Sequence, residues 1–175
     1  LGPRVNAGGR VGEADLGARL LATEDPEEAR TLAAHLHALN AERRAIEAQV
    51  LAQAIAAVER DPGGALVLAA GENWHPGVIG IVASRLKERY NRAACVVALS
   101  GGLGRGSGRS VPGLALGPIV IAAHQAGLLV NGGGHAMAAG FAVEEAKLGQ
   151  LREFLETRVA AALGDAAVMP ELHID

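Results

Sequence analysis

Residues 131–141 read NGGGHAMAAGF, which places three consecutive glycines directly before a histidine. Glycine has no Cβ, so Gly132, Gly133 and Gly134 can adopt positive φ and bring the backbone close to a ligand. Successive N–H groups in such a turn can surround an anion, and His135 adds a donor whose charge can change near neutral pH. The stretch therefore predicts either an anion-binding turn or an ordinary tight turn with a hydrogen-bonded histidine.

A second glycine-rich stretch lies upstream of the first. Residues 101–113 read GGLGRGSGRSVPG and include Arg105, Ser107, Arg109 and Ser110. Residues 64–140 have six basic and two acidic side chains, a net charge of +4, although the whole chain has a net charge of −3. A positive field around exposed backbone attracts anions. The two stretches together favour a site for a phosphorylated ligand.

Composition limits the class of protein. A chain of 175 residues can form one domain with an appendage, and its start at Leu1 without a methionine suggests a piece of a longer protein. No apolar run approaches the roughly 18 residues of a membrane span, and nothing near the start resembles a signal peptide. The single Cys95 excludes an internal disulfide framework and a multi-cysteine zinc site. These features predict a cytoplasmic protein.

Aromatic residues are scarce. Trp74, Tyr90, Phe141 and Phe154 are the whole set. Proteins that grip single strands by stacking usually present an aromatic platform. This chain is therefore expected to hold phosphates, or to rely on aromatic side chains outside these residues.

The order of the expected elements indicates an α/β fold. Residues 25–28 read DPEE and combine a capping aspartate, a proline and acidic side chains, all typical of a helix start. No breaker follows before residues 61–64, which predicts one connecting helix over 25–61 with a length of about 50 Å. We expect strands at 65–70, 93–99, 103–110 (glycine-broken, or a hairpin) and 141–143, and helices at 15–22, 76–90, 117–127 and 144–163. Residues 1–10 contain too much glycine, proline and asparagine for a helix.

His75 stands where an expected strand gives way to a helix. The free N–H groups and the dipole at such a helix N-terminus can bind an anion, although a helix-capping histidine or one at the edge of the core would have the same position. The familiar P-loop, dinucleotide-binding and zinc-protease motifs do not occur in the sequence.

Four stretches resemble segments of one enzyme family, in the same order along the chain. They are LGPRVNAGGR at 1–10, WHPGVIGIVA at 74–83, GSGRSVPG at 106–113 and GGGHAMAAGF at 132–141. The last is similar to the GGGH signature of the domain that accompanies the DHH phosphoesterase domain, and the set resembles the RecJ family. Gly8-Gly9 departs from the family pattern, in which we expect Ala-Gly or Ala-Ala, but it changes no polar group.

The resemblance implies an exonuclease that degrades single-stranded DNA from the 5′ end in repair and recombination. It implies a mixed sheet flanked by helices in a compact DHH-associated domain at 62–163, reached through the connecting helix at 25–61. Residues 1–24 would be the tail of the DHH catalytic domain, and 164–175 a linker and the start of an OB-fold. Mn²⁺ or Mg²⁺ would be bound by the catalytic domain and not by these residues, so the isolated chain is expected to be inactive.

The resemblance also implies roles for individual residues. His135 would lie near the scissile phosphate as a catalytic residue, and Ser107 and Arg109 would hold a phosphate near the 5′ end. The other expected substrate-binding residues are Gly132, Gly133, Gly134, Arg4, Asn6, Arg10 and His75. The expected partner is single-stranded DNA, with a single-strand-binding protein and a helicase as candidate protein partners. We expect no membrane contact and a monomer.

Two other functions remain open at this point. The chain could belong to a phosphodiesterase of the same superfamily that acts on short oligoribonucleotides or cyclic dinucleotides. It could also be a binding module without catalysis that has kept the phosphate pocket. An Asp-His-His motif upstream of these residues would indicate an enzyme.

Overall fold

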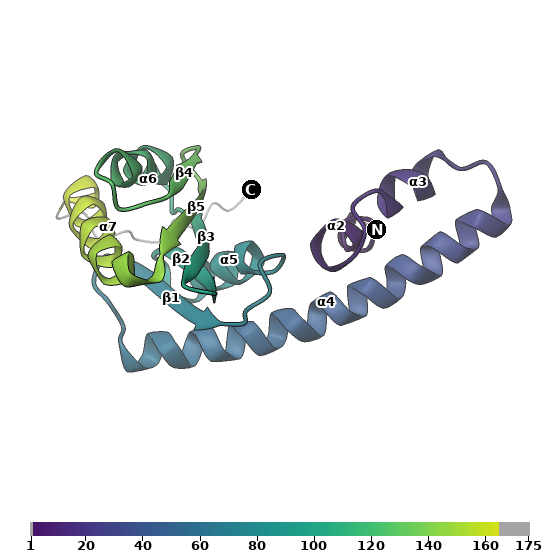
Figure 1. Ribbon diagram of the computed structural model, residues 1–175, viewed down its shortest axis with the longest axis horizontal. Coiled ribbons are helices and arrows are strands. Elements are labelled where there is room, and N and C mark those ends of the chain that lie inside the picture. Colours follow the sequence, from purple (N-terminus) through teal and green to yellow (C-terminus); the bar gives the residue numbers. More distant parts are fainter. Residues whose placement is uncertain (1, 165–175) are drawn as a thin grey trace, which may run out of the picture.

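The computed structural model describes residues 2–164, so residues 165–175, where the start of an OB-fold is expected, lie outside the described residues. One long helix, α4 (Pro26–Arg60), connects two parts of the chain, as Figure 1 shows. Three short helices, α1 (Gly2–Val5), α2 (Gly8–Val11) and α3 (Leu16–Ala22), pack on its first half. An α/β unit packs on its second half.

The prediction that residues 1–10 avoid helix is wrong, because they include α1 and α2. Packing explains the difference. Ala7 and Gly8 are buried, and a Cβ on Gly8 would lie 3.5 Å from a side-chain atom of Leu36 in α4. Tertiary contact thus overrides the low helix propensity of this segment.

The start of α4 agrees with the prediction. The side chain of Asp25 accepts a hydrogen bond of 2.9 Å from the N–H of Glu27, and Pro26 takes the first helical position. The helix buries two apolar groups, one against α1–α3 and one against the sheet: Leu32, Leu36 and Leu39, then Val50, Ala54 and Val58. Between them Arg43 is buried and pairs with Glu47. The apolar stripe is therefore interrupted where the helix passes from one cluster to the other.

The α/β unit is built on a five-stranded sheet with the order β1-β2-β3-β5-β4. The strands are β1 (Leu66–Glu72), β2 (Ala93–Ser100), β3 (Leu103–Arg109), β4 (Asn131–Gly134) and β5 (Ala138–Glu144). β1 and β2 run parallel, and the other three pairings are antiparallel. The predicted mixed sheet is confirmed. β3 is continuous although it contains three glycines, and β5 begins before the predicted residue 141.

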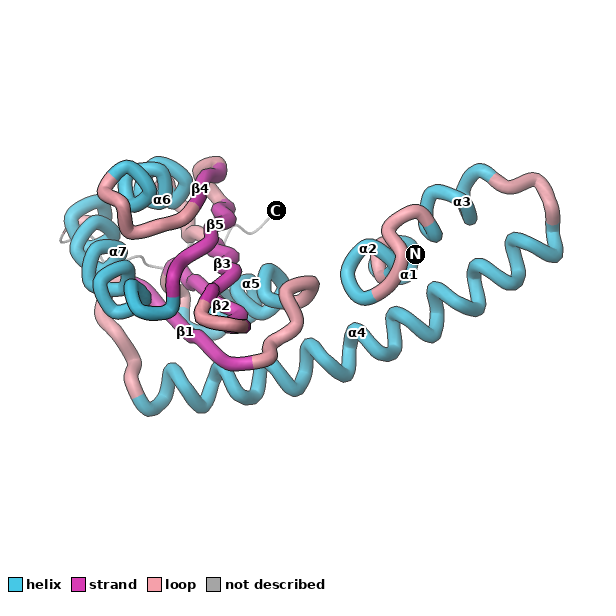
Figure 2. The backbone as a smooth tube through the Cα atoms, viewed as in Figure 1, coloured by secondary structure: helices cyan, strands magenta, loops and turns pink. Residues whose placement is uncertain are grey.

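Helices cover both faces of the sheet (Figure 2). One face packs against α6 (Leu116–Gln125) and α7 (Leu148–Leu163), which follows the 3₁₀ turn η1 (Glu145–Lys147). The other face packs against α5 (Ile79–Tyr90) and the second half of α4. This arrangement confirms the predicted α/β class with flanking helices. Among residues 2–164, no helix is both long and apolar enough to cross a membrane.

Candidate phosphate-binding site

The side chains of β3 separate into a polar row and a glycine row. Successive side chains of a strand point to opposite faces, so the sequence GRGSGR places Arg105, Ser107 and Arg109 together on the α5 side. The glycines between them face the apolar core under α6 and α7. A Cβ on Gly106 would lie 2.1 Å from the ring of Phe141. The glycines of β3 are therefore needed for packing on one face of the sheet. Because side chains alternate along the strand, the polar residues between them all lie on the other face.

Arg109, Ser107 and Gly80 form the centre of the candidate site. Nη1 of Arg109 donates to Oγ of Ser107 at 3.1 Å and to the carbonyl oxygen of Gly108 at 2.8 Å. Gly80 lies in the first turn of α5, and a Cβ there would lie 2.8 Å from Nη2 of Arg109 and 3.1 Å from Oγ of Ser107. A guanidinium, a hydroxyl and a helix N-terminus thus meet in one place. Such donors suit a phosphate group.

Arg10 reaches the same place from the N-terminal part of the chain. Its Nη1 donates to the carbonyl oxygen of Gly77 at 3.4 Å, and a Cβ on Gly77 would lie 2.0 Å from the carbonyl oxygen of Arg10. Burial, and after it the charge of Arg10, lowers the pKa of Arg109. Neither guanidinium has a carboxylate partner within residues 2–164. An anion between them would relieve their repulsion.

Arg4 and Asn6, by contrast, are not brought into this set. Both are exposed, on α1 and in the turn that follows it. Neither side chain makes a hydrogen bond or an ion pair within the described part of the chain. Their expected role toward the substrate therefore gains no support from a contact.

The three glycines before His135 do not form the expected positive-φ turn. They belong to the strand β4, and none of them has a positive φ. Close packing is their actual constraint, since a Cβ on Gly134 would lie 2.6 Å from the Cα of Ala139, and one on Gly132 would lie 3.0 Å from a methyl group of Val120. The prediction of a positive-φ turn at these glycines is thus wrong.

His135 lies in the turn between β4 and β5, and its backbone is fixed on both sides. Its N–H donates to the carbonyl oxygen of Ala138 at 2.8 Å, and its carbonyl oxygen accepts from the N–H of Gly117 in α6 at 3.1 Å. The residue itself is exposed. Because Arg109 pairs with Ala138 in the sheet, His135 and Arg109 lie at the same end of the sheet.

The sheet surface beside Ser107 is bare. Ser107 pairs with Gly140 and Gly140 pairs with Gly133, so these three residues form a row across β3, β5 and β4. A Cβ on Gly133 would meet no atom within 4 Å, and one on Gly140 would meet only the carbonyl oxygen of Gly106 at 4.0 Å. A ligand can therefore approach the backbone closely here.

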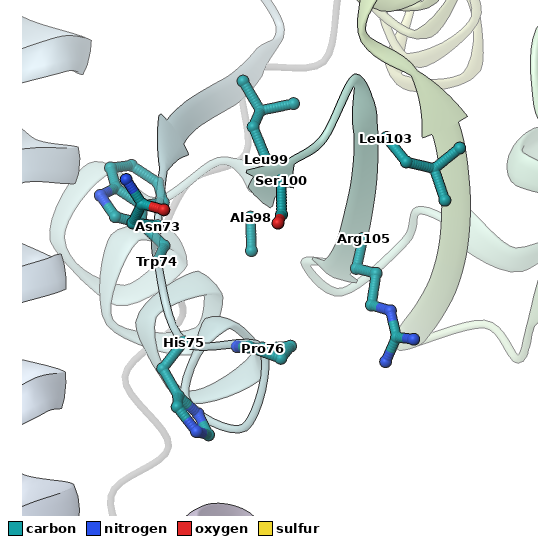
Figure 3. Close-up of a pocket in the computed structure, with 9 residues that line it drawn as sticks. All are labelled: Asn73, Trp74, His75, Pro76, Ala98, Leu99, Ser100, Leu103 and Arg105. Atoms are coloured by element: carbon teal, nitrogen blue, oxygen red, sulfur yellow. The ribbon is translucent and has the colours of Figure 1, made fainter.

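His75 lies away from this row, beside a cavity of about 500 Å³ that it lines together with Arg105 (Figure 3). Its Nδ1 accepts a hydrogen bond of 3.0 Å from the N–H of Gly77. The histidine therefore organises the loop before α5 and also faces a cavity, but it does not cap the helix, whose N-cap residue Val78 has no side-chain capping bond.

Sequence reasoning missed Gly80 as a site residue. The signal that could have found it was the spacing of Gly77 and Gly80 at the expected start of a helix, where glycine is otherwise unfavourable. Arg105, in the same glycine-rich stretch, was likewise not expected to be a site residue. The alternation of glycine with polar residues could have placed it beside Ser107 and Arg109.

Within residues 2–164, no group of three His, Cys, Asp or Glu side chains is arranged to hold a metal ion. Cys95 lies in the core under α6, and burial raises the pKa of its thiol to about 12. A thiol with this pKa stays protonated at neutral pH. The site described above thus consists of hydrogen-bond donors and positive charge.

Comparison with known proteins connects this geometry to a family. Residues 63–161 match the DHHA1 domain. The single-stranded-DNA-specific exonuclease RecJ of Salmonella typhimurium is 38% identical over 183 residues, which cover 100% of this chain and 32% of the relative. RecJ from Thermus thermophilus in complex with Mg²⁺ has a TM-score of 0.80 at 38% identity, over 91% of this chain and 24% of that chain.

A structure of exonuclease RecJ bound to manganese is also similar, with a TM-score of 0.75 at 39% identity, over 90% of this chain and 39% of that chain. The chain thus spans about a third of the length of the Salmonella relative and corresponds to the DHHA1 region of RecJ-like proteins.

Proposed function

Because this chain belongs to the DHHA1 domain family, we propose that it is the phosphate-binding portion of a RecJ-like exonuclease specific for single-stranded DNA. The whole protein hydrolyses phosphodiester bonds from the 5′ end, in the cytoplasm, during repair and recombination. The observation that most supports this role is the contact of Arg109 with Ser107 beside the first turn of α5. Residues 1–24 are the tail of the catalytic domain, 25–61 connect the two lobes, and 62–163 form the DHHA1 domain.

The proposed roles follow from the positions of the side chains. Arg109 and Ser107 hold a phosphate near the 5′ end, and Arg10 adds charge from the N-terminal part. The bare row of Ser107, Gly140 and Gly133 lets the DNA strand lie close to the sheet. His135, at the same end of the sheet as Arg109, donates a hydrogen bond to the scissile phosphate as charge develops on it.

The remaining expected residues have supporting roles in this proposal. Gly132, Gly133 and Gly134 keep the turn that presents His135 compact, and His75 shapes the loop before α5. Arg4 and Asn6, both exposed in the N-terminal part, are proposed to contact the DNA strand, as the family resemblance implies. Single-strand-binding protein and a helicase are candidate partners of the whole protein, which we propose to be a monomer.

The metal ion belongs to the chemistry of the whole protein. The described residues do not fit a Mg²⁺ or Mn²⁺ site, since they offer no cluster of carboxylates and histidines. The ion that such an enzyme uses is therefore proposed to be held by the catalytic domain. What these residues contribute is binding and orientation of the phosphates.

The first prediction concerns the 175-residue chain alone. It should bind single-stranded DNA weakly and hydrolyse none, because its described residues have anion-binding groups but no cluster of metal ligands. Each phosphate contact should contribute about −0.7 to the slope of log K against log salt, so Arg10 and Arg109 together should give about −1.4. A fluorescence anisotropy titration at several salt concentrations measures this slope.

Two results would contradict this proposal. Metal-dependent release of nucleotides by the purified chain would show that the catalytic groups lie within it. Tighter binding of oligoribonucleotides or of cyclic dinucleotides than of DNA under the same salt conditions would favour the alternative phosphodiesterases.

The second prediction concerns Gly80. Gly80→Ala should lower the affinity for 5′-phosphorylated single-stranded DNA about tenfold, because the new methyl group displaces Nη2 of Arg109 and weakens hydrogen bonds to a charged group. The melting temperature should not fall, since the end of an arginine side chain can move and alanine favours a helix. Anisotropy and thermal denaturation measure the two effects.

Gly149→Ala in α7 is the matched control. It is the same substitution in another helix, and a Cβ there meets no atom within 4 Å. It should leave DNA affinity unchanged and raise the stability by up to about 1 kcal/mol. Equal DNA affinity of Gly80→Ala and wild type would show that Arg109 in this position does not hold the strand.

A further inference from the structure

The cavity of about 500 Å³ beside β3 lies next to the Arg109–Ser107–Gly80 set but outside it. Three segments enclose it: the loop after β1, the end of β2 and the start of β3 (Figure 3). Its size is in the range of sites that hold a small organic group. No role proposed above uses this cavity as a binding site.

The chemistry of the cavity suits a flat heterocycle. Ala98 and Leu103 give it an apolar wall, and Leu103 is 42% exposed. Arg105 is exposed and makes no hydrogen bond or ion pair within residues 2–164, so its planar guanidinium is free to stack. Ser100 and His75 add polar groups at the rim. Arginine planes stack on unpaired bases in the same way as aromatic rings.

His75 can offer a donor at this rim. Because its Nδ1 accepts the hydrogen bond from Gly77, the neutral imidazole has its proton on Nε2. That proton can be donated to an acceptor on the edge of a base. The hydrogen bond that organises the loop thus also fixes which ring nitrogen is a donor.

The position of the cavity relates it to the phosphate site. Arg105 and Ser107 are two residues apart on the same face of β3, a separation of about 6.6 Å. In a nucleotide the sugar separates the phosphate from the base by a comparable length. A phosphate held by Ser107 and Arg109 therefore leaves its own base within reach of Arg105.

We propose that this cavity binds the base of the nucleotide whose phosphate Ser107 and Arg109 hold, with the guanidinium of Arg105 stacked on the base. This inference rests on the proposed function. It accounts for single-strand binding by a domain with few aromatic side chains. Stacking tolerates any sequence because every base has a π face.

The test uses the 175-residue chain and 5′-phosphorylated single-stranded DNA whose 5′-terminal nucleotide either has its base or is abasic. Wild type should bind the intact strand at least about fivefold more tightly than the abasic strand, the low end of the effect of one stacked base. Trp74 also lines the cavity and is the only tryptophan of the chain. Its fluorescence should change when the intact strand binds and stay unchanged when the abasic strand binds.

Arg105→Lys separates stacking from charge, because lysine retains the charge but has no plane. It should abolish the preference, so that the intact and the abasic strand bind about equally well, and leave the affinity for the abasic strand unchanged. The matched control is Arg158→Lys on α7, which packs on the opposite face of the sheet and whose guanidinium lies over Phe154. This control should keep the full preference.

Other outcomes would overturn the inference in recognisable ways. Equal affinity of wild type for the two strands would show that the cavity does not hold the base, while the proposed function would stand. Equal losses for both strands in Arg105→Gln, with none in Arg105→Lys, would show that Arg105 contacts a phosphate instead. Absence of binding to either strand would reject the proposed function together with the inference.

Discussion

Replacing His135 with alanine in the full-length protein is expected to lower kcat by roughly 10²–10³, the usual effect of removing one donor that stabilises transition-state charge. KM should change little, because a donor aimed at developing charge affects turnover more than binding. The fold should be unaffected. The hydrogen bonds that hold this turn use the backbone N–H and carbonyl oxygen of His135, and its side chain is exposed.

Steady-state kinetics on single-stranded DNA, together with the melting temperature, test this expectation. His124→Ala is the matched control. His124 is an exposed histidine on α6, and α6 packs on the face of the sheet opposite to the side chains of Ser107 and Arg109. The His124→Ala protein should retain full activity. Wild-type kcat in a well-folded His135→Ala protein would show that the histidine has no part in catalysis.

The sequence was sufficient to predict the connecting helix and the helices that cover the sheet. Asp25 and Pro26 set the start of α4, and the next breaker lies just after its end at Arg60. The buried strand β2 was expected over almost its full length because its residues are almost all apolar. These elements depend on local capping and on continuous apolar runs, which a single sequence displays directly.

Glycine was the main source of error. Its permissive backbone suggested a positive-φ turn at Gly132 to Gly134 and a broken strand around Gly106, whereas both segments are regular strands. In each case the decisive contact comes from residues distant in the sequence, such as Phe141 against Gly106. Sequence alone does not distinguish a glycine needed for φ from one needed for space.

Only part of the candidate site could be predicted, because some of its contacts also come from residues that are distant in the sequence. Ser107 and Arg109 were expected from the family resemblance of their stretch, and the structure adds their contact with each other and with α5. The approach of Arg10 depends on how the N-terminal part docks at Gly77, which no local pattern expresses. A contact that depends on how two distant segments pack, such as that of Arg10 with Gly77, can be identified only from the structure.

Arg109 should distinguish strands by their 5′ end. Arginine presents a planar fork that can bind two phosphate oxygens at once, and lysine offers a point charge. In this site one arm of the fork is already oriented by Oγ of Ser107 and the carbonyl oxygen of Gly108. Arg109→Lys should therefore lose affinity for 5′-phosphorylated strands although the charge is kept.

Arg109→Ala should lose about 10–100-fold on 5′-phosphorylated DNA, as expected for hydrogen bonds to a charged group, and clearly less on strands that end in a 5′-hydroxyl. The ordering follows because only the phosphorylated end presents the additional charged oxygens. Binding titrations at fixed salt with both strand types, using wild type, Arg109→Lys and Arg109→Ala, measure these losses. Equal losses on the two strand types would mean that Arg109 grips an internal phosphate, and the terminal phosphate would then have to be recognised by groups outside this site.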